Sequence, residues 1–446
     1  MFNWRKNILN FLLKISWQKS YEYFCDIKKI EKLSFLEKKE IQNKKLKENL
    51  LYSYKNIPYY KNILEKNWIV NKKLEINLNN FQKLPTLNKE ILRNEFENLQ
   101  DTSNHNRKTF LNTSWWSTGE PVKFIQDNIF WDWVVATKFY FMNFLWKQLW
   151  GKELRLWWSE RDLLVWKDTF TKRLQNWLYN RVECNSFKMT EDDMTNYIDK
   201  INSFKPKVIE AYVQSIYELT KFAKENNLRV YSPKWGIITS AWTLYPDMEK
   251  LIKEVFNCKV INRYWSREVW DIACSRDGNE NLEINILQNY VEILDNNLNP
   301  IKPWETWKIY VTTLNNFSMP LIRYEIWDIW MQSEKEFEIK KVEWREMSVF
   351  KTKEWKIIPW EFFIHFIWVV YNNWWIEQIQ VIQEDYEKIN IKTVIKDKDS
   401  FEKDKVEIVS SIKKVMWKNC VVSFEIVKDI APLPSWKFLY TISKVK

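Results

Sequence analysis

Glycine is almost missing from this chain, while tryptophan is unusually abundant. The 446 residues include 4 Gly and 29 Trp, whereas glycine ordinarily makes up about 7% of a protein. Turns need glycine wherever the backbone adopts positive φ, because a Cβ atom clashes there. The chain can therefore form few tight turns unless some of its tryptophans stand at positions that are glycine in the natural protein.

Several tryptophans do lie where a turn calls for glycine. They precede or separate expected strands in segments 302–308, 354–356 and 372–375. We interpret them as glycines of a lineage in which the UGA codon encodes glycine, read instead as tryptophan. The abundance of Lys, Asn and Ile is typical of an AT-rich genome of that kind. The alternative is a genuinely tryptophan-rich protein, and one of Trp157 and Trp158 is the best candidate for a real tryptophan.

Composition and charge exclude several classes of protein. An aromatic content of 17% rules out a disordered, collagenous or coiled-coil chain. There is no run of 18 apolar residues, so we expect no membrane span, and the apolar stretch 8–15 is too short for a signal peptide. The five cysteines are scattered and form no C-x-x-C pair. They indicate reduced thiols in a cytoplasmic protein without a zinc site.

The hydrophobic pattern divides the chain into regions. Residues 1–70 are lysine-rich with apolar residues at helical spacing, which predicts a packed helical preface or, alternatively, a membrane-surface segment. From 110 to 330, apolar runs alternate with helical stretches, which indicates an α/β domain. Its expected strands are 208–212, 236–240 and 259–262, and its expected helices are 214–226 and 247–256.

The tail has a different pattern. Strands are expected at 376–382, 388–395 and 421–427, with a helix at 401–417 between the second and the third. This β-β-α-β unit is large enough to form a small separate domain. We therefore expect an N-terminal domain of residues 1–344 and a mobile C-terminal domain of residues 345–446.

A loop rich in hydroxyl groups is the strongest local motif. Residues 113–121 have the sequence TSWWSTGEP, which becomes a Ser/Thr/Gly loop before a strand at 122–125 if both tryptophans are glycine. Backbone N–H groups and hydroxyls of such a loop bind phosphate oxygens. The ordinary alternative is a polar turn.

Three further motifs follow along the chain. Tyr264 lies just after an expected strand, and its ring could stack on a base, while Glu268 could bind Mg²⁺ through its carboxylate. Asp328 follows a strand and suits the two hydroxyls of a ribose. Lys437 ends the loop 434–437. Each has an ordinary explanation by itself, such as a solvated Asp at the end of a strand or a surface Lys.

Together and in this order, the motifs resemble the adenylate-forming (acyl-CoA synthetase-like) superfamily. The closest likeness is to its phenylacetate–CoA ligase and CapK-like capsular polysaccharide branch. It extends from residues 57–60 (IPYY) and 84–89 (LPTLNK) to residues 434–437 (PSWK). Members of the branch have glycine at the Trp positions of these motifs, which agrees with the codon hypothesis.

The resemblance implies a nucleotide site made of two loops and several single residues. The phosphate loop would comprise Ser114, Trp115, Trp116, Ser117, Thr118, Gly119 and Glu120, with Glu120 where many relatives have Lys. The loop that lines the nucleotide would comprise Ser240, Ala241, Trp242 and Thr243. Arg267 would belong to the same site.

The remaining roles that the resemblance implies are chemical. Tyr264 would stack on adenine, Glu268 would bind Mg²⁺, and Asp328 would hold the ribose with help from Arg345. Lys437 would bridge the carboxylate and the α-phosphate, and stabilise charge that develops on phosphorus. The Cys/His zinc cluster of some relatives has no counterpart here.

These expectations describe a cytoplasmic ligase that uses ATP, Mg²⁺ and coenzyme A. It would activate a small-molecule carboxylic acid as an acyl-adenylate and pass the acyl group to a thiol. The acyl pocket is expected among residues 130–148, 157–162 and 210–214, while the acid and the oligomeric state stay open. The alternatives are a basic, aromatic-rich nucleic-acid-binding protein, favoured by the net charge of +11, and an inactive scaffold with the same fold.

Overall fold

The computed structural model describes residues 18–445 with gaps at 104–106, 115–121, 149, 158–169, 187–188, 242–243, 296, 344–349, 354–356, 359–362, 364–375, 417–418 and 431–440. The chain divides into two compact units. Unit 1 consists of residues 1–113 and 122–344, and unit 2 of residues 114–121 and 345–446. In the described part, no helix is both long and apolar enough to cross a membrane.

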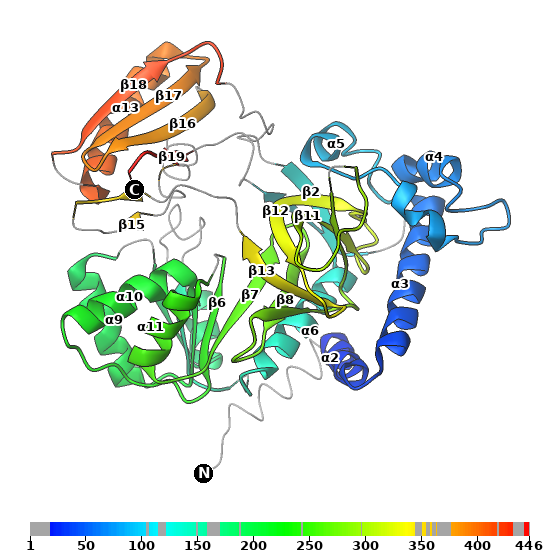
Figure 1. Ribbon diagram of the computed structural model, residues 1–446, viewed down its shortest axis with the longest axis horizontal. Helices are drawn as coiled ribbons and strands as arrows, with labels where there is room; N and C mark the ends of the chain where they lie inside the picture. The colour runs from blue at the N-terminus through cyan, green and yellow to red at the C-terminus, as the bar shows by residue number, and fades with distance from the viewer. Residues whose placement is uncertain are drawn as a thin grey trace. The chain divides into compact units, whose positions relative to one another are not determined.

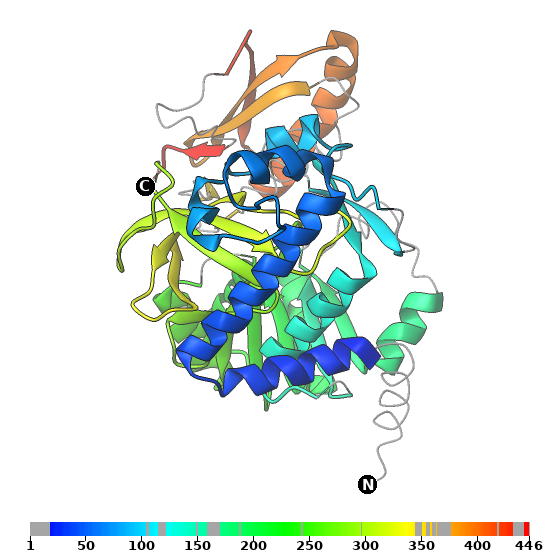
Figure 2. The ribbon, with the colours of Figure 1, turned by 90° about the vertical axis from the view of Figure 1, so that its right-hand side faces the viewer.

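Unit 1 begins, in its described part, with helices α2 (Gln18–Glu31), α3 (Phe35–Asn56) and α4 (Pro58–Lys66). Ser34 starts α3 in a capping box, in which its hydroxyl accepts from the Glu37 amide and the Glu37 carboxylate accepts from the Ser34 amide. Figure 2 shows α3 crossing the strands of the unit, and Asn49 Nδ2 on α3 donates to the Thr313 carbonyl at 3.2 Å. The lysine-rich helix α3 is therefore packed against the sheet.

The segment after α4 contains helix η1 (Leu78–Lys83) and helix α5 (Lys89–Asn94). Arg323 holds this segment in place with a fully buried guanidinium. Its Nη1 donates to the carbonyls of Gln82, at 2.8 Å, and Leu84, and its Nε donates to Glu292 Oε2 at 3.1 Å. One buried cation thus joins the N-terminal region to β10 of the sheet, where the carboxylate of Glu292 pairs with its charge.

The main sheet of unit 1 has eleven strands in its described residues, in the order β10-β11-β12-β13-β9-β8-β7-β6-β5-β3-β4 (Figure 1). The parallel part comprises β3 (Glu153–Trp157), β4 (Arg181–Asn185), β5 (Val208–Tyr212), β6 (Gly236–Ser240) and β7 (Val260–Ser266). The antiparallel part continues through β8 (Trp270–Ser275), β9 (Asn281–Ile284), β10 (Asn289–Leu294), β11 (Thr306–Thr313), β12 (Tyr324–Gln332) and β13 (Glu338–Glu343). A hairpin of β1 (Thr109–Ser114) and β2 (Val122–Asp127) forms a separate two-stranded sheet.

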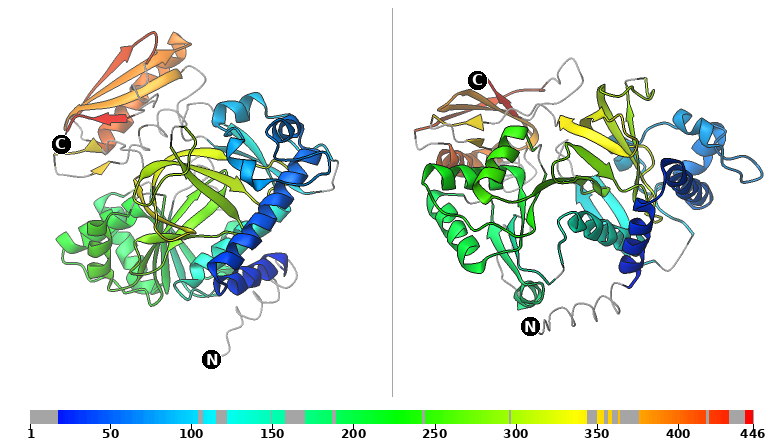
Figure 3. Two further views of the ribbon diagram at one scale, coloured as in Figure 1. Left: turned by 45° about the vertical axis from the view of Figure 1, so that its right-hand side comes forward. Right: turned by 60° about the horizontal axis from the view of Figure 1, so that its bottom comes forward.

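Helices cover both faces of the parallel strands (Figure 3). Helices α9 (Glu191–Phe204), α10 (Val213–Glu225) and α11 (Pro246–Phe256) pack on one face, over Ile209, Ile237 and Val260. Helix α6 (Asn128–Asn143) packs on the other, over Val208, Ile238 and Ile261. Helix α8 (Phe170–Leu178) precedes β4. This layering confirms the predicted α/β class, because alternating strands and helices produce parallel strands between helices.

Unit 2 contains the predicted β-β-α-β arrangement. Strands β16 (Ile376–Asp385) and β17 (Lys388–Ile395) pair antiparallel, and helix α13 (Lys398–Val415) leads to β18 (Val421–Ile426). Strand β19 (Thr441–Ser443) completes a four-stranded sheet in the order β18-β17-β16-β19, and the short strands β14 (Phe350–Lys351) and β15 (Ile357–Ile358) form a second sheet. Ile379, Ile391 and Ile408 belong to its own apolar core.

Four described tryptophans have the left-handed backbone that favours glycine. Their φ values are 57° for Trp68, 58° for Trp146, 59° for Trp270 and 73° for Trp304. Positive φ is a genuine outlier for a bulky residue because its Cβ crowds the following carbonyl. Trp304 lies in one of the three segments where the sequence predicts glycine, and its φ supports that hypothesis. Residues 355, 374 and 375 are outside the described residues.

Candidate active site

Two of the predicted site residues meet in the interior of unit 1. Tyr264 on β7 donates its hydroxyl to Asp328 Oδ2 on β12 at 2.6 Å, and both side chains are buried. Burial, followed by the charge of Asp328, raises the pKa of Tyr264 well above its ordinary value. The phenol therefore stays protonated and can only donate to the carboxylate, which fixes the orientation of Asp328.

The ring of Tyr264 packs on a tryptophan of β12. Its centroid lies 4.2 Å from that of Trp330, and the tyrosine is 2% exposed. Adenine stacking on Tyr264 stays a prediction, and it requires a face of this ring to become uncovered.

Glu268 lies in the turn between β7 and β8 and is held from two sides. Tyr324 donates its hydroxyl to Glu268 Oε1 at 3.3 Å, and Lys89 Nζ lies 3.8 Å from the same oxygen. Burial and the charge of Glu268 raise the pKa of Tyr324 well above its ordinary value. The carboxylate is thus fixed in position by a phenol and an ammonium group.

Sequence reasoning did not assign a role to Lys89 or Tyr324. Lys89 ends the motif of residues 84–89, and Tyr324 lies four residues before Asp328. The signal that could have found them is their position inside motifs that carry the resemblance.

The same turn contacts both strands that flank the predicted phosphate loop. Arg267 Nη1 donates to the Thr113 carbonyl at the end of β1, at 3.1 Å. Gln126 on β2 donates its Nε2 to the carbonyls of Arg267, at 3.2 Å, and Glu268, at 3.1 Å. Three of the sequence motifs are therefore adjacent in unit 1 at their described residues.

The end of β6 is a second edge of the site. Ser240 is buried and its hydroxyl has no hydrogen-bond partner among the described residues, while Ala241 has a φ of 72°. Parallel sheets bind ligands at the carboxyl ends of their strands. An unpaired hydroxyl at this edge suits a polar group of a ligand, because burying it without a partner is costly.

Several predicted residues fall outside the described part of the chain. They are Trp115, Trp116, Ser117, Thr118, Gly119, Glu120, Trp242, Thr243, Arg345 and Lys437. Ser114 ends β1, and its side chain is not described. Their roles stay predictions.

Aromatic rings meet where the sequence predicts the acyl pocket. Trp157 on β3 stacks on Tyr212 on β5 with centroids 4.1 Å apart. Trp265 lies 6.3 Å from Trp157 and 5.9 Å from Trp270. We call Trp157, Tyr212, Trp265 and Trp270 the aromatic layer. It joins two of the three segments expected at the acyl pocket to the turn that carries Glu268.

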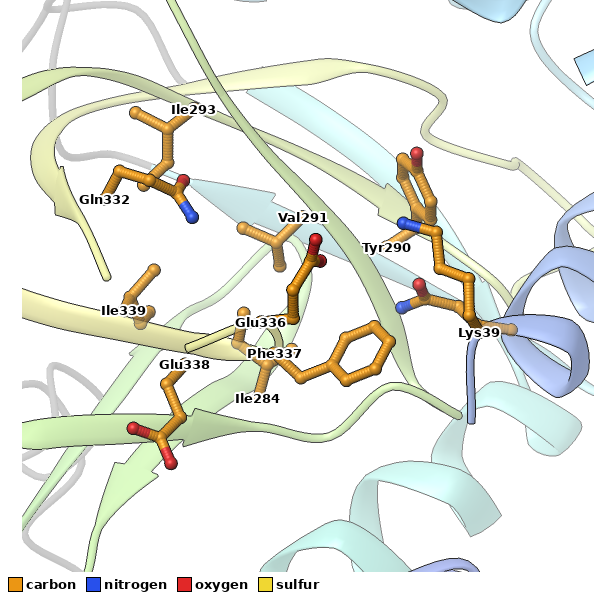
Figure 4. Close-up of a pocket in the computed structure, with 11 residues that line it drawn as sticks. Lys39, Ile284, Tyr290, Val291, Ile293, Gln332, Glu336, Phe337, Glu338 and Ile339 are labelled. Carbon is orange, nitrogen blue, oxygen red and sulfur yellow. The ribbon is translucent and has the colours of Figure 1, made fainter. Parts of the chain in front are cut away.

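A separate hollow lies between α3 and the antiparallel strands of unit 1. Figure 4 shows Lys39, Tyr290 and Phe337 among the side chains that line it. None of the predicted site residues lines it. We therefore assign the candidate site to the motifs above and not to this hollow.

The donors of this site fit a magnesium ion to a limited extent. Mg²⁺ is commonly bound by one or two carboxylates together with substrate phosphates. Glu268 provides one buried carboxylate next to strands that flank the predicted phosphate loop. Among the described residues, no group of three or more His, Cys, Asp or Glu side chains could hold a metal ion by itself.

Comparison with known proteins gives one family match and one curated relative. Residues 350–444 match the model of the CapK C-terminal domain family. The chain is 24% identical to Protein CapK of Staphylococcus aureus over 436 residues. This alignment covers 95% of this chain and 93% of that protein.

Solved structures of similar fold include 2-hydroxyisobutyryl-CoA ligase in two states. The complex with 2-HIB-AMP and CoA in the thioesterification state has a TM-score of 0.60 and 13% identity, over 93% of this chain and 91% of that chain. The postadenylation state with R3-HIB-AMP has a TM-score of 0.57 and 13% identity, over 92% and 90%. The chain has the fold of these ligases, and the family match and the curated relative confirm its predicted resemblance to CapK.

Proposed function

We propose that this protein activates a carboxylic acid with ATP and transfers the acyl group to coenzyme A. In the first step, R–COO⁻ and ATP give R–CO–AMP and pyrophosphate. In the second step, the thiol of coenzyme A attacks the acyl carbon, which forms the thioester and releases AMP. Activation is needed because a carboxylate is a poor electrophile, whereas AMP is a good leaving group.

One observation carries the proposal most directly. The Tyr264–Asp328 hydrogen bond and the contacts of Glu268 bring together motifs that are far apart in the sequence. Asp328 would accept from the ribose hydroxyls, and the donor Tyr264 would keep its carboxylate in a fixed orientation. Glu268 would hold the magnesium ion, which neutralises charge on the phosphates when bound.

Domain movement belongs to the same proposal. Residues 345–446 would act as a small mobile domain, and Lys437 would contribute a positive charge during adenylation. Rotation of that domain would then withdraw Lys437 and admit the thiol. We place the reaction in the cytoplasm, in keeping with five cysteines that are all free. The comparisons lend no support to the nucleic-acid alternative.

The test is ATP–pyrophosphate exchange with a panel of carboxylic acids. The native gene is expressed with a glycine tRNA that reads UGA. Each UGA codon then gives Gly, and the ordinary tryptophan codon gives Trp. We expect acid-dependent exchange from this protein and little from the chain with tryptophan at every such position, because indoles would occupy tight turns. Lys437→Ala should lower the exchange rate about a hundredfold or more.

The matched control is Lys444→Ala in the same unit, since Lys444 is an exposed residue paired with Glu384. It should leave exchange unchanged. If no acid in a broad panel supports exchange and the protein does not bind ATP, the proposed function is wrong and the inactive scaffold is favoured.

A further inference from the structure

Unit 1 contains a cluster of buried and half-buried charges next to the aromatic layer. We call it the charged layer, and it comprises Lys138, Lys147, Glu153, Arg155, Arg181, Glu210, Arg263 and Asp271. Its two central carboxylates, Glu210 and Glu153, each pair with three cations. Glu210 lies 3.5 Å from Lys138, 2.9 Å from Arg155 and 3.0 Å from Arg263, and Glu153 lies 2.8 Å from Lys147, 2.8 Å from Arg155 and 3.3 Å from Arg181.

Positive charge is in excess in this layer. Its described members are five cations and three carboxylates, and the exposed Glu183 is a further carboxylate that acts on Arg155. Burial raises the pKa of Asp271, which lies 3.4 Å from Arg263. The pKa of Lys138 is lowered to about 7 by burial, with repulsion from Arg155 and Arg263 opposing the attraction of Glu210. An added anion would relieve this imbalance, because buried charges are stable only when paired.

The charged layer lies next to the expected acyl pocket. Three strands each carry a member of the charged layer two residues before a member of the aromatic layer: Arg155 before Trp157, Glu210 before Tyr212, and Arg263 before Trp265. Alternate residues of a strand point to the same side. Arg155 and Glu210 are in register with each other, whereas Arg263 is in register, across β6, with Tyr212. The two layers therefore adjoin on the same face of the sheet, the face that α6 covers.

Two cations of the layer are partly exposed. The side chain of Lys138 is 31% exposed and that of Arg155 is 19% exposed. Trp270 has positive φ, and the indole nitrogen of Trp265 is buried without a hydrogen-bond partner among the described residues. Both observations favour glycine at these two positions. With glycine at both positions, Trp157 and Tyr212 would be the rings that remain in the aromatic layer.

We propose that the acid activated by this enzyme carries a second anionic group, a carboxylate or a phosphate, which Lys138 and Arg155 bind at the far end of the acyl pocket. The inference rests on the proposed function, and it names the substrate class of the same site. The reacting carboxylate would lie at the nucleotide, and the second anion would lie among the excess cations.

The test compares acids of equal length with and without the second anion. ATP–pyrophosphate exchange is measured for glutarate and pentanoate, for adipate and hexanoate, and for a phosphono-carboxylic acid, with the UGA-decoded protein. We expect kcat/KM to favour the dianionic acids by about tenfold or more, the effect of one charge-assisted hydrogen bond. Preference for carboxylate over phosphonate, or the reverse, then identifies the second group.

Variants distinguish a binding role from a structural one. Lys138→Met should abolish the preference by raising KM for the dianionic acids, while Lys138→Arg, which keeps the charge, should retain most of it. Lys224→Met removes an exposed lysine of α10 and should retain it fully. Equal use of both kinds of acid by the parent protein, or an unchanged preference in Lys138→Met, would overturn the proposal.

A direct binding measurement separates this inference from the proposed function. Calorimetry compares glutarate with its monomethyl ester on the parent protein and on Lys138→Met. Tighter binding of glutarate that is lost in the variant supports the anion site even if no exchange occurs, whereas equal binding of the two compounds contradicts it. Exchange with monoanionic acids alone would leave the proposed function standing and reject the anion site.

Discussion

The hydroxyl of Tyr264 on β7 donates to Asp328 on β12, although three strands lie between β7 and β12 in the order of the sheet. The bond is possible because the antiparallel part of unit 1 curls, so that β12 approaches β7 although the strands are not neighbours. A tyrosine with a raised pKa is a permanent donor, and it leaves the remaining acceptor capacity of the carboxylate for a ligand.

Replacing Tyr264 by Phe should weaken nucleotide binding. The change removes one hydrogen bond to a carboxylate, so we expect KM for ATP to rise about tenfold, with a smaller effect on kcat. Exchange kinetics at varied ATP give the measurement. Tyr60→Phe is the matched control, because Tyr60 is also buried and donates to the Pro320 carbonyl at 2.9 Å. It should lower the free energy of unfolding and leave KM for ATP unchanged. A higher KM for ATP in Tyr60→Phe together with an unchanged KM in Tyr264→Phe would contradict the role of Tyr264.

Glu268→Gln should change the magnesium requirement. The amide keeps the size of the side chain and loses the negative charge, so we expect the exchange rate to fall about a hundredfold and the half-saturating magnesium concentration to rise. Titration of exchange with MgCl₂ measures both. Glu249→Gln on α11 serves as the control, since that carboxylate is paired with Lys253 on the helix surface. An unaltered magnesium profile in Glu268→Gln would exclude Glu268 as the ligand.

Lys89 should act as a positioning residue for Glu268. Its Nζ lies 3.8 Å from the carboxylate, so Lys89→Met should raise the half-saturating magnesium concentration about tenfold, as loss of an outer partner of a metal ligand does. Lys89→Arg should show a much smaller rise in the half-saturating magnesium concentration, because it keeps the charge. A purely structural role would lower stability in both variants and shift the magnesium profile in neither.

Trp304→Gly should stabilise the chain with tryptophan at this position. Relief of a left-handed backbone is worth about 1–2 kcal/mol, which outweighs the exposed contacts of the indole with Glu334 and Lys340. Urea unfolding should show a net gain of about 1 kcal/mol. Trp133→Gly, in the buried face of α6, should instead destabilise by several kcal/mol. A loss of stability in Trp304→Gly would count against glycine at this position.

Stability should rise with pH through Lys138. Its pKa is lowered from the ordinary 10.5 to about 7 in the folded state. Between these values the unfolded chain binds a proton that the folded chain does not, so the free energy of unfolding increases with pH from about 7 upward. Lys138→Met should flatten this increase in urea unfolding at pH 7, 8 and 9, and Lys224→Met should not. An identical slope in Lys138→Met and the parent protein would contradict this assignment.

Three of the five parallel strands, β5, β6 and the start of β7, could be predicted because they are mainly apolar runs, which is typical of strands buried on both faces. β5 and β6 match the predicted ranges 208–212 and 236–240. The predicted end of β7 at residue 262 was too early, since the strand continues to Ser266. Its polar residues Asn262 and Arg263 interrupt the apolar run, and Arg263 is buried only because it pairs with Glu210 and Asp271. β19 is three residues long, too short for a pattern to reveal.

The motifs point to candidate site residues and not to how they meet. The Tyr264–Asp328 bond depends on the curl of the sheet, and the Lys89–Glu268 contact depends on how the segment after α4 packs. Neither leaves a local pattern in the sequence. The charged layer did leave one, since Arg155, Glu210 and Arg263 each interrupt an apolar strand at a position that faces α6. Charges on three strands of the parallel part, β3, β5 and β7, were the available indication that they would pair.

The anchoring of residues 78–94 by Arg323 constrains the order in which unit 1 can fold during translation. Arg323 follows its carbonyl partner Gln82 by 241 residues, so the early helices emerge from the ribosome long before the cation that fastens them. Domains ordinarily fold as units, with N-terminal ones completed first. Here residues 78–94 lack their partners until β12 has been made, so apolar side chains such as Leu84 and Leu87 stay uncovered while most of unit 1 is translated.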